Sequence, residues 1–307
     1  MKREGYNLII ILGPTASGKT GIAARLARDL GSEVISADSR QVYRGMDLGT
    51  GKDISEFMVD GVAVPCHLID IVDTDHEFNL FEYQKMFYRC FSEISERGIT
   101  PIMAGGTGLY IEAVVKDYRM LEVPENSSLR GELQKMDMDA MRDRLFKSNP
   151  ALHNTTDTQD RGRLIRAIEI AEHSKMREFA EKIEHPLINP FIIGIRWERS
   201  VLRDRITERL KKRIDMGMIE EVKNLHDQGV SWERLDSFGL EYRYVSRYLQ
   251  GKMDFEEMFR QLNTRIHQFS KRQMTWFRRM ERRGIVIHWM DNADYASIKR
   301  LVKEHVG

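Results

Sequence analysis

A short glycine-rich segment near the start of the chain has the residue types that bind phosphate. It fits the pattern G-x-x-x-x-G-K-[ST] at every fixed position. In such a loop, backbone N–H groups turn toward phosphate oxygens, and the positive end of the following helix helps to hold the anion. The segment predicts an oligophosphate site, without saying which oligophosphate binds or whether a phosphoryl group moves. Its residues are Gly13, Pro14, Thr15, Ala16, Ser17, Gly18, Lys19 and Thr20.

Two side chains of this loop add chemistry beyond the backbone. Lys19 brings a full positive charge to the phosphates. The Thr20 hydroxyl can join the oxygen ligands of Mg²⁺.

Acidic and hydroxyl side chains follow other predicted strands. Asp38 comes just after the strand predicted at 33–36, at the carboxyl edge of the sheet where ligands bind. There it can hold Mg²⁺, act as a general base, or cap a helix. Asp70 and Asp73 are rival carboxylates for a metal. Thr107 can face the site or cap a helix, and the sequence leaves these choices open.

Two segments concentrate positive charge. Residues 201–213 hold six Lys or Arg against two acids, and Arg205 and Arg209, four apart, share one helix face. They can grip a diphosphate from the side opposite Lys19, or lie on an ordinary solvated helix. Residues 260–283 hold eight Lys or Arg and one acid, with aromatic residues among them. Such a segment can follow a nucleic-acid backbone while its aromatic residues pack behind it or stack on bases. The alternative places the aromatic residues in the core, which is favoured for Trp276 and Phe277, and leaves the charges in solvent.

Whole-chain composition excludes several classes of protein. The 307 residues carry 48 Lys and Arg against 47 Asp and Glu, so a protein that coats nucleic acid with its whole surface is excluded. The apolar run Leu8 to Leu12 is far too short to span a membrane. Two cysteines build neither a disulfide framework nor a cysteine zinc site. We expect a cytoplasmic protein with no membrane association.

The elements that must position these residues alternate in type. Strands are predicted at 7–12, 33–36, 67–72 and 100–104, with helices at 19–30, 78–96 and after 108, which indicates an open parallel sheet. Residues 117–190 show helical patterns and no convincing strand. The strand pattern returns at 191–195 and 285–289, with helices predicted at 200–228, 241–250 and 254–283 and a short one at the end. The sequence therefore predicts an α/β core of residues 1–116 and 191–307 with a helical insertion at 117–190.

Six motifs together resemble the bacterial tRNA dimethylallyltransferases, also called tRNA isopentenyltransferases. In chain order they are GPTASGKT at 13–20, ISADSRQVYRGMDLGTGK at 35–52, HLIDI at 67–71, AGGTGLY at 104–110, GRLIRAIEI at 162–170 and TRIHQFSKRQMTWFR at 264–278. They span nearly the whole chain, so the set is far more specific than the phosphate loop alone. Two segments depart from the family pattern, Gly-Leu-Glu-Tyr-Arg at 239–243 and Glu-His-Ser-Lys at 172–175.

The resemblance implies a P-loop NTPase-like parallel sheet flanked by helices, with an inserted helical domain that contacts the tRNA anticodon arm. It implies transfer of a dimethylallyl group from dimethylallyl diphosphate to N6 of the adenosine 3′ of the anticodon, position 37. The P-loop would bind diphosphate rather than spend ATP. Mg²⁺ is the implied cofactor, the anticodon stem-loop is the implied partner, and we expect a monomer.

The resemblance also implies roles for single residues. Asp38 is the implied general base; Lys19, Thr20 and Arg209 stabilise the leaving diphosphate, with Mg²⁺ at Thr20; and Thr107 contacts the substrate. The implied diphosphate site is the P-loop together with Arg209. The implied tRNA contacts are Asp38, Ser39, Arg40, Gln41, Thr107, Arg130, Gly162, Arg163, Leu164, Ile165, Arg166, Lys271, Arg272, Gln273, Met274, Thr275, Trp276, Phe277 and Arg278.

Three other functions fit part of the sequence. A small-molecule P-loop kinase explains the loop and Asp38, but it does not need the basic segment at 260–283. An isopentenyltransferase acting on free nucleotides shares the chemistry, but its small acceptor does not require that segment either. A tRNA-binding protein with a degenerate site is disfavoured by the intact Lys19, Thr20 and Asp38.

Overall fold

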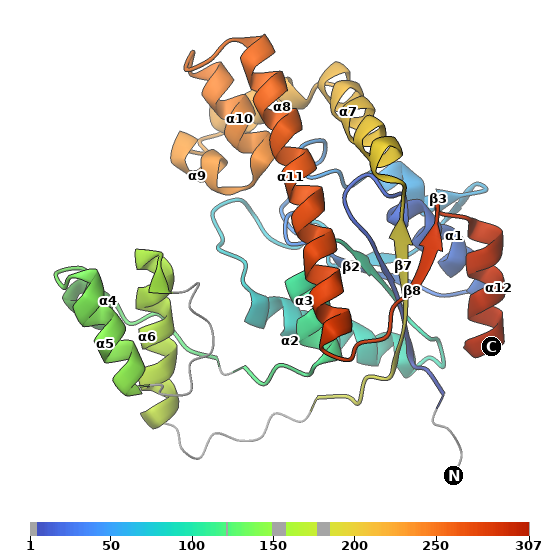
Figure 1. Cartoon of the computed structure of the whole chain (residues 1–307), viewed down its shortest axis with the longest axis horizontal. Coiled ribbons are helices and arrows are strands. Elements are labelled where there is room, and N and C mark those ends of the chain that lie inside the picture. Colours follow the sequence, from blue (N-terminus) through green and yellow to red (C-terminus); the bar gives the residue numbers. More distant parts are fainter. Residues whose placement is uncertain (1–4, 121, 149–157, 177–184, 307) are drawn as a thin grey trace. The chain divides into compact units, whose positions relative to one another are not determined.

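The computed structural model describes residues 5–120, 122–148, 158–176 and 185–306 (Figure 1). The chain divides into two compact units, one made of Met1–Asp117 with Pro186–Gly307 and the other of Tyr118–His185. Among the described residues, no helix is both long and apolar enough to cross a membrane.

A six-stranded parallel sheet forms the centre of the first unit, in the order β5-β2-β6-β1-β7-β8. Both faces of the sheet are covered, which is why its central strand β1 is a continuous apolar run with every residue buried. The sheet confirms the predicted P-loop NTPase-like α/β class. The strands are β1 (Leu8–Leu12), β2 (Val34–Ala37), β5 (Cys66–His67), β6 (Ile102–Gly105), β7 (Pro190–Arg196) and β8 (His288–Asp291).

Alternate residues of β1 point to opposite faces and enter different cores. Leu8 and Ile10 pack with α2 (Leu80–Ser95), α3 (Gly108–Val115) and the end of α11 (Phe255–Arg282). Ile9 and Ile11 pack with α1 (Lys19–Leu30) and α12 (Tyr295–His305) on the other face.

A layer of helices covers the carboxyl edge of the sheet. Their shared core includes Ala16 of the P-loop and the loop residues Val42, Tyr43 and Met46. The phosphate loop is therefore part of the same packed core as these helices. They are α7 (Arg199–Asp215), α8 (Met218–Asp227), α9 (Trp232–Ser237), α10 (Leu240–Leu249) and α11.

Some sequence predictions about elements were wrong. The strand predicted at 67–72 is only the two-residue β5, because Leu68 (φ 62°) and Asp70 (φ 54°) adopt left-handed backbone that leaves the sheet. The single helix predicted at 200–228 is α7 and α8, separated at Gly217, which has φ 102°. Helix α9, the short 3₁₀ helix at Ile54–Phe57 and the hairpin β3 (Met58–Val59) with β4 (Val62–Ala63) were not anticipated.

The second unit is helical in its described residues. It contains α4 (Ser127–Leu133), α5 (Met138–Ser148) and α6 (Arg161–Met176). These helices share a small apolar core of Leu133, Met141, Leu145, Leu164, Ile165, Ile168 and Ala171.

Candidate active site

The phosphate loop turns sharply between β1 and α1. Ala16 (φ 61°) and Gly18 (φ 84°) hold left-handed backbone, which glycine adopts without steric cost. A β-carbon on Gly13 would lie only 2.7 Å from Ser17 Oγ, so that position needs glycine as well. Lys19 Nζ donates to the Pro14 carbonyl at 3.3 Å, across the loop. Burial and the nearby Arg209 guanidinium lower the pKa of Lys19 to about 8.

Arginines of α7 contact the phosphate loop, which agrees with one of the two interpretations that the spacing of Arg205 and Arg209 left open. Arg205 Nε donates to the Ala16 carbonyl at 2.9 Å, and its guanidinium lies 4.3 Å from the Trp197 ring centroid. Arg209 Nη1 donates to Thr15 Oγ1 at 3.3 Å and forms an ion pair with Asp53. Both arginines are therefore fixed against the phosphate loop rather than free in solvent.

Asp38 begins the loop that follows β2, and it caps no helix. Its Oδ1 accepts from the Arg40 amide at 3.0 Å, and the carboxylate lies near enough to Lys19 to influence its charge. Thr107 stands at the start of α3 but does not cap it; its Oγ1 accepts instead from the Ser39 amide at 3.1 Å. The ends of β2 and β6 thus meet through Ser39 and Thr107.

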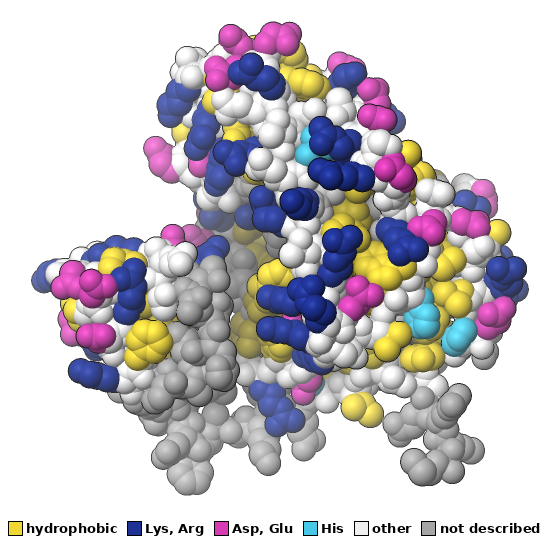
Figure 2. Space-filling view, viewed as in Figure 1, with side chains coloured by type: hydrophobic (Ala, Val, Ile, Leu, Met, Phe, Trp, Pro, Cys, Tyr) yellow, Lys and Arg dark blue, Asp and Glu magenta, His cyan; other side chains and the backbone are white. Residues whose placement is uncertain are grey.

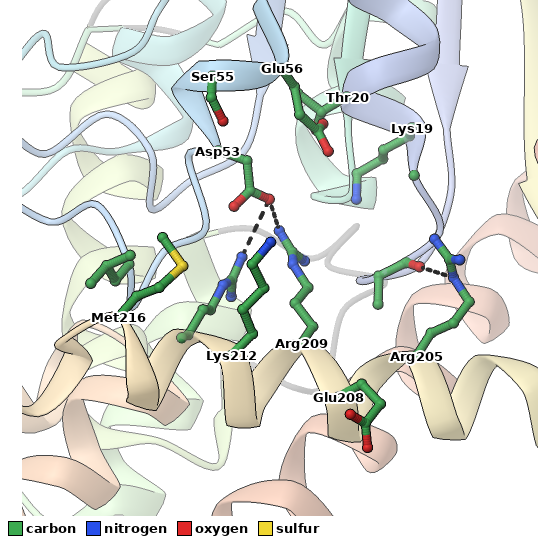
Figure 3. Close-up of a pocket in the computed structure, with 14 residues that line it drawn as sticks. Lys19, Thr20, Asp53, Ser55, Glu56, Arg205, Glu208, Arg209, Lys212 and Met216 are labelled. Carbon is green, nitrogen blue, oxygen red and sulfur yellow. Dashed lines mark hydrogen bonds and ion pairs between the residues drawn. The ribbon is translucent and has the colours of Figure 1, made fainter.

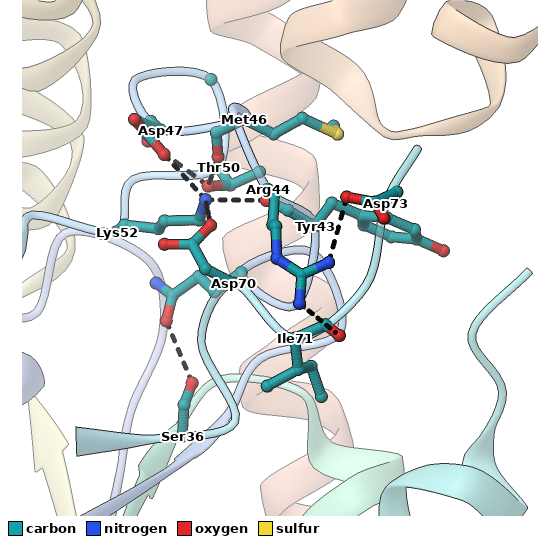
Figure 4. A network of polar contacts seen from close by, with 12 residues as sticks. Ser36, Tyr43, Arg44, Met46, Asp47, Thr50, Lys52, Asp70, Ile71 and Asp73 are labelled. Atoms are coloured by element: carbon teal, nitrogen blue, oxygen red, sulfur yellow. Dashed lines mark hydrogen bonds and ion pairs between the residues drawn. The ribbon is translucent and has the colours of Figure 1, made fainter. Parts of the chain in front are cut away.

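An internal ion-pair network shapes the loop between Gln41 and Lys52 (Figure 4). Lys52 is fully buried, and its ammonium donates to the Tyr43 carbonyl and Asp47, each at 2.7 Å, and also to Asp70. Asp73 pairs at 3.0 Å with Arg44. Asp70 and Asp73 are thus structural partners of cations, and neither lines a cavity at the phosphate loop, which corrects their prediction as rival metal ligands.

Glu221 of α8 binds the backbone in the second half of that loop. Its carboxylate accepts from the backbone amides of Asp47 at 2.9 Å, Leu48 at 2.6 Å and Gly49 at 3.0 Å. The buried Tyr242 hydroxyl donates to the same carboxylate at 2.6 Å. Helices α8 and α10 therefore fix the loop that forms one wall of the site.

Gly106 and Gly108, which follow β6, lie close to α11. A β-carbon on Gly106 would overlap Gln273 Nε2, and one on Gly108 would overlap the Trp276 ring. Gln273 accepts from the Thr15 amide at 2.8 Å and donates to the Gly106 carbonyl at 2.9 Å. Glu112 of α3 is fully buried and forms ion pairs with Arg279 at 2.5 Å and Arg283 at 2.9 Å. These contacts lock α11 onto the site.

In the part of the chain that the structure describes, two cavities of more than 200 Å³ meet at the phosphate loop. The smaller, of about 240 Å³, is lined by Asp38 and Thr107 together with Phe238, Glu241 and Phe269. The larger, of about 690 Å³, contains Asp53, Glu56 and the cations of α7 (Figure 3). Four residues line both, namely Lys19, Thr20, Arg209 and Arg213. A diphosphate at these four residues would have an open space on either side.

The oxygen donors near the loop suit a hard divalent cation. Thr20 lines both cavities, and Asp38 lines the smaller one. The described residues contain no cluster of three or more His, Cys, Asp or Glu side chains that could hold a metal by themselves. Mg²⁺ commonly takes one or two protein oxygens and completes its shell with substrate phosphates and water. The donor set therefore fits an ion brought to Thr20 with a diphosphate.

The segment of α11 predicted to contact tRNA has two faces. Lys271, Arg272, Thr275 and Arg278 are exposed, and Lys and Arg side chains gather along α11 in Figure 2. Phe277 is fully buried in the sheet core, so its side chain cannot contact RNA as predicted. Gln273 is buried against the phosphate loop and lines the smaller cavity, so its predicted contact is possible only with a base that enters that cavity. Met274 and Trp276 are half-buried against the same core.

Of the residues in the second unit that were predicted to contact tRNA, some are exposed and others are buried. Gly162 and Arg163 are exposed, whereas Leu164 and Ile165 lie in the unit's core, so their side chains are unavailable to RNA. Arg130 donates two hydrogen bonds, of 2.8 and 2.9 Å, to the buried carboxylate of Glu169. Arg166 pairs with the same carboxylate at 3.0 Å. Both arginines keep about a third of their side-chain surface exposed, 31% and 38%.

Several site residues were missed in the sequence. Arg213 lies four residues after Arg209 on α7, so helical spacing alone could have indicated it. Gln273 was assigned to RNA rather than to the phosphate loop. Asp53, Glu221 and Glu241 gave no local signal, because their role depends on segments that are distant in sequence.

Comparison with known proteins identifies the family. The IPP transferase family model matches residues 41–280, which is most of the chain. The chain belongs to the IPP transferase family. The isopentenyl transferase model also matches this IPP transferase, over residues 6–61.

Relatives of this IPP transferase match over nearly their full length. It is 59% identical to tRNA dimethylallyltransferase 1 of Syntrophus aciditrophicus, with 97% of each chain covered. It is 55% identical to tRNA dimethylallyltransferase 1 of Geotalea uraniireducens, over 93% of this chain and 92% of the relative.

Solved structures agree with this assignment. The tRNA isopentenylpyrophosphate transferase of Bacillus halodurans superposes with a TM-score of 0.70 at 33% identity, covering 98% of this chain and 96% of the other. A eukaryotic dimethylallyltransferase shares the fold, with a TM-score of 0.77 at 21% identity over 97% of this chain and 78% of the other. The comparisons confirm the family that the six sequence motifs indicated.

Proposed function

We propose that this IPP transferase moves the dimethylallyl group of dimethylallyl diphosphate to N6 of the adenosine 3′ of the anticodon, position 37 of a tRNA, and releases diphosphate. The observation that carries the proposal is the smaller cavity. Its walls bring a carboxylate, Asp38, together with the phosphate loop at Lys19 and with Thr107. One cavity therefore offers a proton acceptor and an anion site, which the transfer requires.

The phosphate side of the site stabilises the leaving group. As the allylic carbon–oxygen bond breaks, negative charge grows on the diphosphate, and preorganised cations and N–H groups lower the energy of that charge. Lys19, Thr20 and Arg209 line the cavity at this position, and Arg209 is held there by Thr15. Mg²⁺ held at Thr20 would supply further positive charge to the diphosphate.

The opposite wall activates the acceptor. The exocyclic amine of adenine is a weak nucleophile, so a carboxylate must take its proton as the nitrogen–carbon bond forms. Asp38 is the only carboxylate besides Glu241 among the described residues lining the smaller cavity. Thr107 already orders Ser39, the residue after Asp38, and so fixes the loop that presents the carboxylate.

The tRNA reaches the site over α11 in this proposal. Exposed Lys271, Arg272 and Arg278 can pair with backbone phosphates, and Arg40 and Phe269 at the smaller cavity can meet an unstacked base. Exposed Arg163 of the second unit offers a further contact to the anticodon arm. We expect the enzyme to act as a monomer in the cytoplasm, where its tRNA substrate is found.

One experiment separates this function from the kinase alternative. The protein is incubated with an anticodon stem-loop RNA, Mg²⁺ and either dimethylallyl diphosphate or ATP, and the RNA is analysed by mass spectrometry. A five-carbon addition to one adenosine, abolished when that adenosine is replaced by guanosine, is the expected result. A transferred phosphate, or no five-carbon addition to the RNA, would exclude the proposal.

A further inference from the structure

Arg213 is a buried cation without hydrogen-bond partners for two of its nitrogens. The residue is 8% exposed, and its Nε and Nη2 have no hydrogen-bond partner among the described residues. Buried guanidinium groups are costly unless they are paired. Arg213 nevertheless lines both cavities that meet at the phosphate loop. A buried guanidinium with two nitrogens free of hydrogen bonds can bind an anion at that place.

One carboxylate lies between Arg213 and Arg209. Asp53 forms an ion pair with Arg209 (Figure 3). It forms a longer ion pair with Arg213, in which Oδ2 lies 3.6 Å from Nη2, beyond hydrogen-bonding distance. Asp53 holds left-handed backbone, φ 44°, which non-glycine residues adopt only at a cost. Its side chain thus lies between two cations, and the surrounding structure holds it in that position.

The backbone beside Asp53 leaves room for both arginines. Gly51 has φ 68°, and a β-carbon there would overlap Arg213 Nη2 and lie 2.7 Å from Arg209 Nη2. The two guanidinium groups therefore converge on one point next to the phosphate loop. Since guanidinium groups repel each other, such convergence is stable only with negative charge between them.

The negative charges that face Arg213 are the carboxylates of Asp53 and Glu241. Burial and, after it, the Arg209 guanidinium lower the pKa of Arg213 to about 10, while Asp53 and Glu241 act in the opposite direction. Burial raises the pKa of Glu241, which weakens it as a counter-ion. Lys19 also lies near Asp38 and Glu56, so Asp53 is the carboxylate that Arg209 and Arg213 share. The two nitrogens of Arg213 that lack a hydrogen-bond partner can bind an anion with several oxygens, such as a diphosphate.

We infer that Arg213 is a second diphosphate-binding arginine beside Arg209, and that Asp53 holds both guanidinium groups in place until the diphosphate displaces it. The inference rests on the proposed function, because it concerns the same diphosphate. Two guanidinium forks can bind separate oxygens of one diphosphate. The carboxylate competes with that anion, so it weakens diphosphate binding and favours release of the product.

The test measures binding of inorganic pyrophosphate with Mg²⁺ by isothermal titration calorimetry, which requires no transfer reaction. Arg213→Gln should weaken binding more than threefold. Arg203→Gln removes the same charge from an exposed position of α7 outside both cavities and should stay within threefold of the unmodified protein. Arg213→Lys serves if the glutamine variant does not fold by circular dichroism; it keeps the buried charge but loses the fork, and more than threefold weaker binding is again expected.

Asp53→Asn tests the second half of the inference, because it removes the competing charge and keeps the shape of the side chain. Pyrophosphate binding should become tighter. Weaker or unchanged binding would overturn the competing role of Asp53, and binding by the Arg213 variants within threefold of the unmodified protein would overturn the role of Arg213. If pyrophosphate binding depends on Arg213 but no dimethylallyl transfer occurs, the proposed function fails and the diphosphate site stands.

Discussion

The side-chain amide of Gln273, on α11, is hydrogen-bonded to the backbone amide of Thr15 in the phosphate loop, at 2.8 Å. The same side chain donates to the Gly106 carbonyl at 2.9 Å and so bridges the turns after β1 and β6. Its neighbours Lys271 and Arg272 face solvent on the same helix. A single helix therefore carries a basic surface on one side and a support of the phosphate site on the other.

Replacing Gln273 by leucine should damage the phosphate loop more than RNA binding. The Thr15 amide and Gly106 carbonyl would lose their buried partner, which costs about 1–3 kcal/mol per unsatisfied group. We expect a lower melting temperature and a raised KM for dimethylallyl diphosphate, with RNA affinity within about twofold of the unmodified protein. Thr275→Val, an exposed change on the same helix, is the matched control. An unchanged KM in a destabilised Gln273 variant would make the residue purely structural.

Asp38→Asn should retain RNA binding and lose turnover. The amide keeps the shape of the carboxylate but cannot accept the amine proton, and general bases typically contribute about 10²–10⁴-fold to rate. Single-turnover transfer to the stem-loop RNA measures the loss, and filter binding measures RNA affinity. Glu241→Gln, the other carboxylate of the smaller cavity, is the comparison. If the Glu241 variant loses more activity than the Asp38 variant, the base has been misassigned.

Paired alanine substitutions at Lys271 and Arg272 should weaken tRNA binding and reduce its salt dependence. Each lost phosphate contact lowers the slope of log K against log salt by about 0.7–0.9. Pyrophosphate binding should not change, because neither residue lines the cavities at the phosphate loop. Arg300→Ala with Lys303→Ala removes two exposed charges from α12 and serves as the control. Equal salt slopes for the two double variants would remove α11 from the RNA interface.

Diphosphate affinity should fall as the pH rises above about 8. Burial and Arg209 lower the pKa of Lys19 to about 8 in the free enzyme, so the ammonium loses its proton through this range. A bound diphosphate stabilises the ammonium and raises that pKa, so binding takes up a proton above pH 8. Calorimetry in buffers of different ionisation enthalpy would detect the uptake. Lys19→Arg, which stays charged, should show less proton uptake than the unmodified protein; equal uptake would assign the proton to another group.

The sequence alone determined the class of fold and the position of the phosphate loop. Both are local properties: a buried parallel strand is a continuous apolar run, and the eight residues from Gly13 to Thr20 form the loop by themselves. Family motifs in chain order added the expected chemistry. The short length of β5 was not predicted, because the left-handed turn at Leu68 and Asp70 has no signal in the apolar pattern, and the Lys52 that binds Asp70 lies 18 positions away.

Only the tertiary structure decided what surrounds the phosphate loop. Asp70 and Asp73 form ion pairs away from the cavities. The Thr107 hydroxyl accepts from the Ser39 amide instead of capping α3. Gln273 and Phe277 of the basic helix are buried. The key contacts of the tertiary structure join residues that are far apart in the chain: Asp53 and Arg209 are 156 positions apart, and Thr15 and Gln273 are 258 apart. No local pattern encodes such contacts, because they form only when packing of the sheet and the helices brings the segments together.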